Sequence, residues 1–224
     1  CRFPARHHWL RQRLALNPAQ LPELAAVRDR LRGWRFYDGF RTDTAAPARR
    51  AQVGTRAPRL ADDGANLAAA IQTILESGTG ADDLQRAVTD AFGGASLAVR
   101  ATDGLFELQM RQPGMRRPLR AAELSDGTLR FLLWAAALLA PEPPSLMVLN
   151  EPENSLHPDL IDPLAGLIRD AAAHTQVVVV SHSAALVENL GADCTRIVLT
   201  KRDGATVIEG QGLLDAPAWH WGSR

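Results

Sequence analysis

Acidic residues and a histidine in the C-terminal half of the chain follow directly on apolar runs, and they are the residues best suited to chemistry on a phosphate. The run Leu146-Met-Val-Leu-Asn-Glu-Pro-Glu153 passes from four apolar residues into Asn150 and Glu151. A second run, Gln176-Val-Val-Val-Val-Ser-His182, ends in a histidine. At the carboxyl end of a strand in an open parallel sheet, Asn150 and Glu151 would stand where a phosphate and its metal bind, so this pattern predicts nucleotide hydrolysis.

The elements that would position these residues can be predicted from the same stretch. Each apolar run has the length and composition of a strand buried on both faces. Between the two runs, Asp159 to Ala173 has its apolar residues at helical spacing. Strand, helix and strand in this order predict a parallel unit over 146–180. Ligands bind at the carboxyl ends of strands in open parallel sheets, so Glu151 and His182 are predicted to meet at one edge.

A third segment, Glu123-Leu-Ser-Asp-Gly-Thr-Leu-Arg130, opens a predicted helix that is apolar nearly all round and extends over 128–140. Ser125 and Gly127 fall at its N-terminus, where unpaired N–H groups and the positive end of the helix dipole suit a phosphate. Taken alone, Ser-Asp-Gly is an ordinary turn and helix start, so a phosphate role depends on the neighbouring motifs.

Together these segments resemble the ABC-type ATPases, in the branch of RecF, SMC and OLD-nuclease proteins. Four motifs carry the resemblance in the family's order: Leu124–Gly127 is similar to the signature motif, Leu146–Glu151 to the Walker B strand, Asn154–Pro158 to the D-loop, and His182 to the switch histidine. The Glu-Pro-Glu sequence resembles small bacterial ATPases of the AAA-ATPase-like RecF group more than transporter ATPases. The resemblance covers Glu123 to Lys201 closely and the preceding residues loosely.

The resemblance implies an α/β fold of the P-loop NTPase type, with ATP and Mg²⁺ as cofactors and two copies of the chain enclosing the nucleotides. It implies that Glu151 orients the attacking water and that His182 contacts the γ-phosphate. The residues implied to reach the partner's nucleotide or to lie across the dimer interface are Ser125, Asp126, Gly127, Asn154 and His157. It further implies a role in DNA repair, DNA maintenance or defence, with DNA or an effector protein as a partner.

Asn150 departs from the family pattern, which has an aspartate that holds Mg²⁺ through water. An amide oxygen offers the ion a dipole where it prefers a charge, so weaker metal binding and slower turnover are expected. One hypothesis is that Glu151 or Glu153 supplies the missing charge, in which case Asn150→Asp leaves activity little changed. The alternatives are a nucleotide-sensing assembly module that recruits a partner with negligible hydrolysis, and a degenerate scaffold that binds no nucleotide.

The chain contains no Gly-x-x-x-x-Gly-Lys-Ser/Thr loop, whose amides and lysine would cradle the phosphates. Its single lysine is Lys201, near the C-terminal end. In the family this loop lies upstream of the motifs quoted above. We therefore expect it to precede Cys1, and we expect the present chain alone to be inactive; the alternative is a degenerate protein without the loop. The predicted domains are an arm and lid over 1–121 and the C-terminal half of the ATPase core over 122–224.

The residues before the signature-like motif predict a helical and β-hairpin insertion. The expected elements are helices over 21–31, 67–76 (with Asn66 as N-cap) and 82–92, a half-buried strand over 34–38, and a hairpin of 96–101 with 105–111 around Asp103-Gly104. Residues 41–63 have no periodicity and form either a flexible connection or a segment wrapped against the core. Arg49 and Arg50 within them are surface arginines or, alternatively, phosphate or DNA contacts. A second Asp-Gly turn, at 203–204, predicts a hairpin at one edge of the main sheet.

Composition restricts the partners and the compartment. Lys+Arg and Asp+Glu are both 25, so net charge gives no general attraction to nucleic acid, and a DNA contact would need a local patch. The two cysteines, Cys1 and Cys194, have no metal-type spacing, which indicates a reducing compartment. No apolar run approaches the roughly 18 residues of a membrane span, and no signal-peptide pattern opens the chain. These features predict a cytoplasmic protein without a membrane partner.

Overall fold

The computed structural model describes residues 22–202 and 204–210 of this chain of 224 residues. The chain divides into two compact units, the first ending at Leu190 and the second beginning at Gly191. The first described element is helix α2 (Pro22–Arg32), which ends at Gly33 as predicted. The arginines before Pro22 lie outside the described residues.

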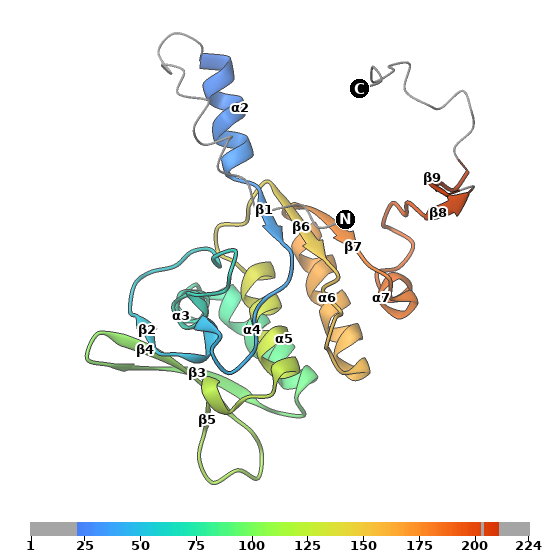
Figure 1. The fold of residues 1–224 in the computed structure, drawn as a ribbon. Coiled ribbons are helices and arrows are strands. Elements are labelled where there is room, and N and C mark those ends of the chain that lie inside the picture. Colours follow the sequence, from blue (N-terminus) through green and yellow to red (C-terminus); the bar gives the residue numbers. More distant parts are fainter. Residues whose placement is uncertain (1–21, 203, 211–224) are drawn as a thin grey trace. The chain divides into compact units, whose positions relative to one another are not determined.

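A three-stranded parallel sheet carries the residues predicted to do chemistry (Figure 1). Its strands, in spatial order, are β1 (Arg35–Tyr37), β6 (Leu146–Asn150) and β7 (Gln176–Val180). Tyr37 pairs with Leu149, and Asn150 pairs with Val180. Because all three strands run in the same direction, their carboxyl ends meet at one edge of the sheet. The predicted parallel unit over 146–180 is confirmed.

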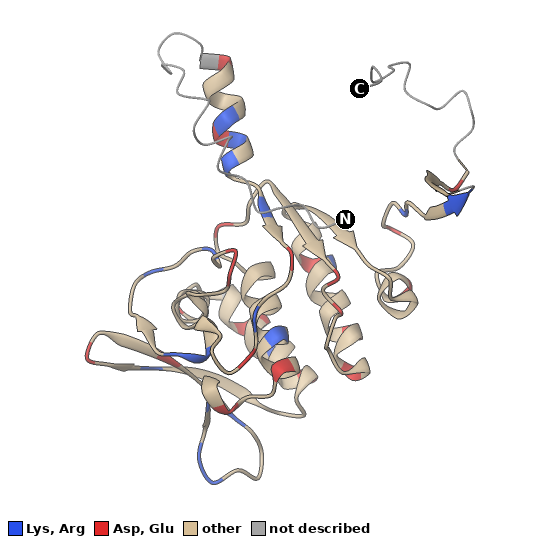
Figure 2. Ribbon diagram, viewed as in Figure 1, with Lys and Arg blue, Asp and Glu red and all other residues tan. Residues whose placement is uncertain are grey.

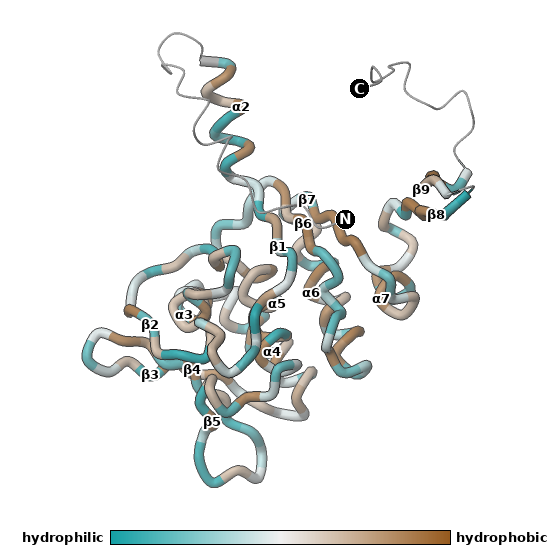
Figure 3. Tube along the Cα trace, in the orientation of Figure 1, coloured by the Kyte–Doolittle hydropathy of each residue, from teal (hydrophilic) through white to brown (hydrophobic). Residues whose placement is uncertain are grey.

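One face of this sheet is buried and the other is partly exposed, so the expectation of strands buried on both faces was wrong. Met147 and Leu149 are 1% and 0% exposed, whereas Val178 and Val180 are 42% and 46% exposed. The two runs are apolar throughout, and Figure 3 shows β6 and β7 as hydrophobic along most of their length. A continuous apolar run does not reveal which of its faces has a packing partner, because that depends on elements remote in sequence.

Helix α5 (Asp126–Leu138) lies at the centre of the first unit and contacts α3, α4 and α6. Its side chains from Phe131 to Ala137 are at most 1% exposed, as expected for a helix apolar nearly all round. The crossover from β6 to β7 consists of a 3₁₀ turn, η3 (Pro158–Leu160), and helix α6 (Ile161–Ala172). A short helix after β7, α7 (Ala184–Asn189), was not predicted; the Ser183 side chain caps it.

An antiparallel sheet precedes α5 in the sequence. It contains β2 (Gln52–Val53), β3 (Ser96–Thr102), β4 (Leu105–Arg111) and β5 (Leu119–Arg120), in the order β2-β4-β3 with β5 also paired to β4. Asp103 and Gly104 turn the predicted hairpin with φ of 52° and 75°, which is the positive-φ pair of a type I′ turn. Helices α3 (Leu67–Leu75) and α4 (Thr79–Ala91) contact both this sheet and α5.

The segment over 41–63 packs against the core, which decides between the two predicted alternatives. Ala46 and Leu60 within it are 0% and 1% exposed, and it includes the 3₁₀ turn η1 (Pro47–Arg49). Asn66 precedes α3, but its side chain makes no capping hydrogen bond. Instead it closes the preceding loop, accepting from the N–H of Ala61 and donating to the carbonyl of Arg59. The predicted N-cap role of Asn66 was therefore wrong, because a loop contact uses the same side chain.

In the second unit, β8 (Leu199–Arg202) and β9 (Ala205–Ile208) form the predicted hairpin. Among the described residues they form a two-stranded sheet, and their place at one edge of the main sheet stays a prediction. An Asp-Gly turn determines local pairing but not the sheet to which a hairpin belongs. Among the described residues, no helix is long and apolar enough to cross a membrane.

Candidate functional site

The structure brings Glu151 and His182 together at the carboxyl edge of the parallel sheet. Nε2 of His182 lies 3.2 Å from Oε1 of Glu151. The N–H of Glu151 donates to the carbonyl of Val180 at 2.7 Å, which continues the ladder between β6 and β7 by one residue. Glu151 has φ of 47°, in the left-handed region that glutamate rarely adopts. Such conformations cost free energy and cluster at functional sites, so this one marks Glu151 as a candidate.

Both carboxylate oxygens of Glu151 are engaged. Nδ2 of Asn154 donates to Oε2, on the side away from His182. The Glu151 side chain is 34% exposed and the His182 side chain 84%, so the imidazole faces solvent. The carboxylate is therefore held in place while the histidine remains accessible to a ligand.

Glu153 anchors the turn that carries His182. Its Oε1 accepts from Oγ of Ser181 at 2.6 Å and from the N–H groups of His182 and Ser183 at 3.1 and 3.2 Å. Its Oε2 is buried and has no hydrogen-bond partner within the described part of the chain. The hydrogen bonds of Glu153 thus go to the residues after β7 rather than to Asn150.

Asn150 contacts a carboxylate that the sequence analysis did not identify. Its Nδ2 donates to Oδ1 of Asp38 at 2.7 Å. Asp38 directly follows β1, and the pairing of Tyr37 with Leu149 brings it level with Asn150. The signal available in the sequence was that the strand over 34–38 also ends in an acid. Only the parallel pairing of β1 with β6 shows that the two strand ends coincide.

The start of α5 adjoins the turn that follows β6. Ser125 is the N-cap of α5: its Oγ accepts from the N–H of Thr128 at 3.1 Å, and the side chain is exposed. Gly127 approaches the turn closely, since a Cβ on it would lie 3.1 Å from the carbonyl oxygen of Ser155. The two segments implied to face a partner subunit, 125–127 and 154–157, are therefore neighbours within one chain.

His157 and Asp126 are exposed at this position. Nδ1 of His157 accepts from the N–H of Asp159 at 3.4 Å, a long hydrogen bond at the start of η3. The Asp126 side chain is 63% exposed and is paired with Arg49. Among the hydrogen bonds that the described residues form, none joins His157 or Asp126 to Glu151.

Arg49 connects the segment after β1 to the turn before α5, so both interpretations offered for it from the sequence were wrong. Its side chain is 7% exposed. Nη1 donates to the carbonyls of Leu124 and Ala121 at 2.7 and 3.1 Å, and Nε donates to the carbonyl of Thr42 at 2.8 Å. Nη2 lies 2.6 Å from Oδ1 of Asp126. The guanidinium therefore holds the turn that precedes Ser125 and balances the charge of Asp126.

Other charged groups are spread over several elements. Figure 2 shows basic residues on α2 and on the loop between β4 and β5, among other places. On that loop Arg117 forms two hydrogen bonds to Glu123, at 2.6 and 2.8 Å, and lowers the pKa of Glu123 to about 2. Glu123 also accepts from the N–H of Arg120, at the start of the 3₁₀ turn η2 (Ala121–Glu123).

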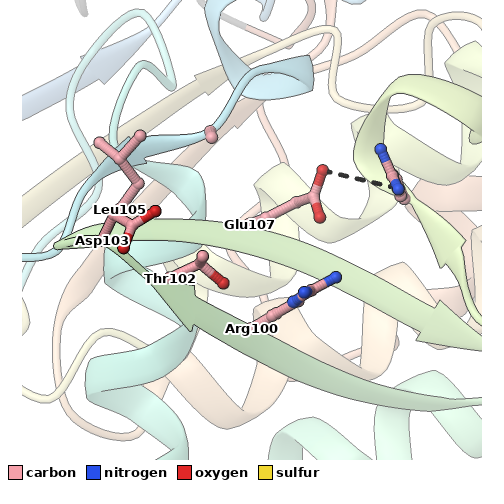
Figure 4. Close-up of a pocket in the computed structure, with 7 residues that line it drawn as sticks. Arg100, Thr102, Asp103, Leu105 and Glu107 are labelled. Carbon is pink, nitrogen blue, oxygen red and sulfur yellow. Dashed lines mark ion pairs between the residues drawn. The ribbon is translucent and has the colours of Figure 1, made fainter.

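A hollow on the antiparallel sheet involves different residues (Figure 4). Seven residues line it: Ala51, Arg100, Thr102, Asp103, Leu105, Glu107 and Arg120. Glu107 and Arg120 form an ion pair of 3.8 Å across it. No residue of the candidate site lines this hollow.

A parallel sheet flanked by helices, with an acid and a histidine at its carboxyl edge, defines an α/β domain of the P-loop NTPase type. The chain matches the family model described as "AAA domain, putative AbiEii toxin, Type IV TA system" over residues 5–188. It belongs to this family of AAA-domain ATPases. No curated protein matches the sequence.

Solved SMC ATPase structures share the fold. One, from work on ATP-driven dimerization and DNA-stimulated activation of SMC ATPases, is 18% identical with a TM-score of 0.50, covering 65% of this chain and 89% of that chain. The Smc head domain with coiled coil and joint from Pyrococcus yayanosii is also 18% identical with a TM-score of 0.50; the match covers 65% of this chain and 28% of the Smc chain. The predicted fold class is confirmed.

Proposed function

We propose that this chain is the C-terminal part of an ATP-hydrolysing core, in which Glu151 orients the attacking water and His182 contacts the terminal phosphate. The contact of 3.2 Å between these side chains at the carboxyl edge of the parallel sheet carries the proposal. Phosphoryl transfer depends mainly on positioning and charge stabilisation. Glu151 is suited to the first, since Asn154 and His182 hold both of its oxygens.

The residues at this edge fit ATP and Mg²⁺. Asp38 and Asn150 each offer a hard oxygen donor, which Mg²⁺ prefers. The exposed imidazole of His182 and the N-terminus of α5 are suited to phosphate oxygens. Bound Mg²⁺ would neutralise charge that develops on the phosphates.

The loop that cradles the phosphates would have to come from outside the printed sequence, because the only lysine in this sequence is Lys201. Within the described residues β7 pairs with a strand on one side only, which leaves its outer edge available for a further strand. We propose that a strand and Gly-Lys-Ser/Thr loop from the intact protein occupy that edge.

The proposal includes ATP-dependent association of two copies. The segments 125–127 and 154–157 are adjacent in one chain, and Ser125, Asn154 and His157 are exposed and free to face a partner. The SMC ATPase of the first structural comparison is described as dimerising with ATP and as stimulated by DNA. For this chain DNA or an effector protein is the proposed further partner, in DNA repair, DNA maintenance or defence.

ATP turnover by the intact protein, with its phosphate-binding loop, tests the assignment of Glu151. Glu151→Gln should lower turnover on the order of 10²-fold or more, because the general base is lost. ATP-dependent dimerisation should be retained, since the amide preserves the side chain's shape. Glu188→Gln, an exposed carboxylate on α7, is the matched control and should leave turnover unchanged. Equal turnover in the wild type and the Glu151→Gln variant would reject this role of Glu151.

The second candidate function is a nucleotide-sensing assembly module with negligible hydrolysis. The amide at Asn150, where the ABC-type ATPases that the sequence resembles have an aspartate, favours it. The same assay decides: wild-type protein that dimerises with ATP and yet shows no turnover supports the assembly module. Wild-type protein that neither binds ATP nor dimerises contradicts both candidates.

A further inference from the structure

We propose that Asp38 supplies the negative charge that an aspartate at the position of Asn150 supplies in the ABC-type ATPases resembled by this sequence, so that Asp38 and Asn150 act as one metal-facing pair. The inference rests on the proposed function and names a residue for it. In this chain the negative charge stands at the end of β1 instead of at the end of the neighbouring strand β6, and both positions lie at the same edge of the sheet.

The parallel pairing of β1 with β6 makes this exchange possible. Phe36 pairs with Val148 and Tyr37 with Leu149, so the next residue of each strand, Asp38 and Asn150, stand level. Nδ2 of Asn150 donates to Oδ1 of Asp38 at 2.7 Å. This bond uses the amide nitrogen of Asn150 and one carboxylate oxygen of Asp38. The amide oxygen of Asn150 and the second carboxylate oxygen of Asp38 are left as ligands for a hard cation.

The two side chains are chemically complementary, which gives a reason for the amide at position 150. A carboxylate accepts hydrogen bonds and cannot donate them when ionised. With aspartate at both positions, two like charges would face each other at hydrogen-bonding distance, and such pairs disfavour ionisation of both groups. One acid and one amide avoid this repulsion. Asparagine at 150 is therefore expected where the neighbouring strand already ends in an aspartate.

The other carboxylates at this edge have partners that suit different roles. Glu153 accepts three hydrogen bonds from Ser181, His182 and Ser183, so it holds the histidine turn. Glu151 is bound by Asn154 and His182. Asp38 is exposed and makes its hydrogen bond to Asn150 itself. Of the three acids, Asp38 is therefore the one placed to compensate for the missing charge.

The test is an exchange of the two residue types in the intact protein carrying Glu151→Gln, so that bound ATP is not turned over. Mn²⁺ serves as the probe, and its binding to the protein–ATP complex is measured by electron paramagnetic resonance. Asp38→Asn should weaken Mn²⁺ binding about 10- to 100-fold, by analogy with loss of groups that tune a metal site. The double variant Asp38→Asn/Asn150→Asp restores one acid and one amide and should recover most of that loss.

ATP binding in the presence of EDTA separates a metal role from a structural role, because Asp38→Asn should leave it unchanged. Asp90→Asn removes an exposed acid on α4 and is the control for net charge; it should not change Mn²⁺ binding. Mn²⁺ binding by the Asp38→Asn variant at the level of the parent protein would overturn the inference. So would a double variant as weak as Asp38→Asn although it is folded. A parent protein that binds no ATP would instead overturn the proposed function.

Discussion

Replacement of Arg49 by methionine should destabilise the first unit by about 3 to 5 kcal/mol, because the backbone carbonyls that it bonds lose their charged donor. The Arg49 side chain is 7% exposed, and its two shortest bonds to carbonyls, at 2.7 and 2.8 Å, reach Leu124 and Thr42. Each hydrogen bond to a charged group contributes about 1.5 to 3 kcal/mol, so these two account for the figure. Asp126 adds little, because its side chain is 63% exposed and water can replace the guanidinium.

Urea unfolding of this chain, followed by circular dichroism, measures the loss as a shift of the midpoint at constant slope. The stability of Arg49→Lys should lie between those of wild type and Arg49→Met. The lysine ammonium is a compact charge and cannot reach the two carbonyls that the planar guanidinium bonds through separate nitrogens. Arg50→Met is the matched control: this neighbouring arginine is exposed, so the change should stay within about 0.5 kcal/mol.

A loss below about 1 kcal/mol for Arg49→Met would contradict the reasoning, because that is the worth of one ordinary hydrogen bond. A loss equal to that of Arg50→Met would do the same. Either result would mean that the turn before α5 is stabilised by its own packing and that the hydrogen bonds of Arg49 contribute little to it.

Three further predictions concern the segment at α5 and two titrating groups. Gly127→Ala should weaken ATP-dependent dimerisation of the intact protein, measured by size-exclusion chromatography, because its Cβ would lie 3.1 Å from the carbonyl oxygen of Ser155. Burial raises the pKa of Tyr37 from 10.0 to about 12, so stability from the neutral phenol is complete below pH 10 and lost as pH rises towards 12. Tyr37→Phe should remove that alkaline loss and cost about 1 kcal/mol at neutral pH, since a buried hydrogen bond to a carbonyl disappears. Arg117 lowers the pKa of Glu123 from 4.5 to about 2, so this pair contributes stability above pH 4.5 that is lost as pH falls towards 2; Glu123→Gln should flatten that acid slope in unfolding measurements.

Each of these predictions has a control or a contradicting result. Gly166→Ala on α6 should leave dimerisation unchanged and raise stability by about 0.4 to 1 kcal/mol, since its Cβ would meet only Nη2 of Arg169, at 3.8 Å. Dimerisation of Gly127→Ala equal to wild type would show that the approach to Ser155 is not critical. The sequence has one tyrosine, so tyrosinate absorbance reports Tyr37 alone, and titration near pH 10 would contradict its burial. An acid slope unchanged by Glu123→Gln would mean that another carboxylate produces it.

The sequence by itself determined the local elements and the order of the acid and the histidine. Asp103-Gly104 specified a hairpin because both residues tolerate positive φ. The apolar runs before Asn150 and Ser181 specified strands, and strand–helix–strand order specified their parallel pairing. These signals lie within one element or between consecutive elements. For that reason the contact between Glu151 and His182 could be anticipated.

The tertiary structure alone decided the partners that are remote in sequence. Asp38 and Asn150 are 112 residues apart, and no periodicity shows that β1 pairs with β6. Arg49 reaches carbonyls more than 70 residues away and was indistinguishable in the sequence from its exposed neighbour Arg50. The physical reason is common to both cases. The amino-acid type determines which groups a side chain can bond, whereas the packing of distant elements determines which of those groups lie within reach.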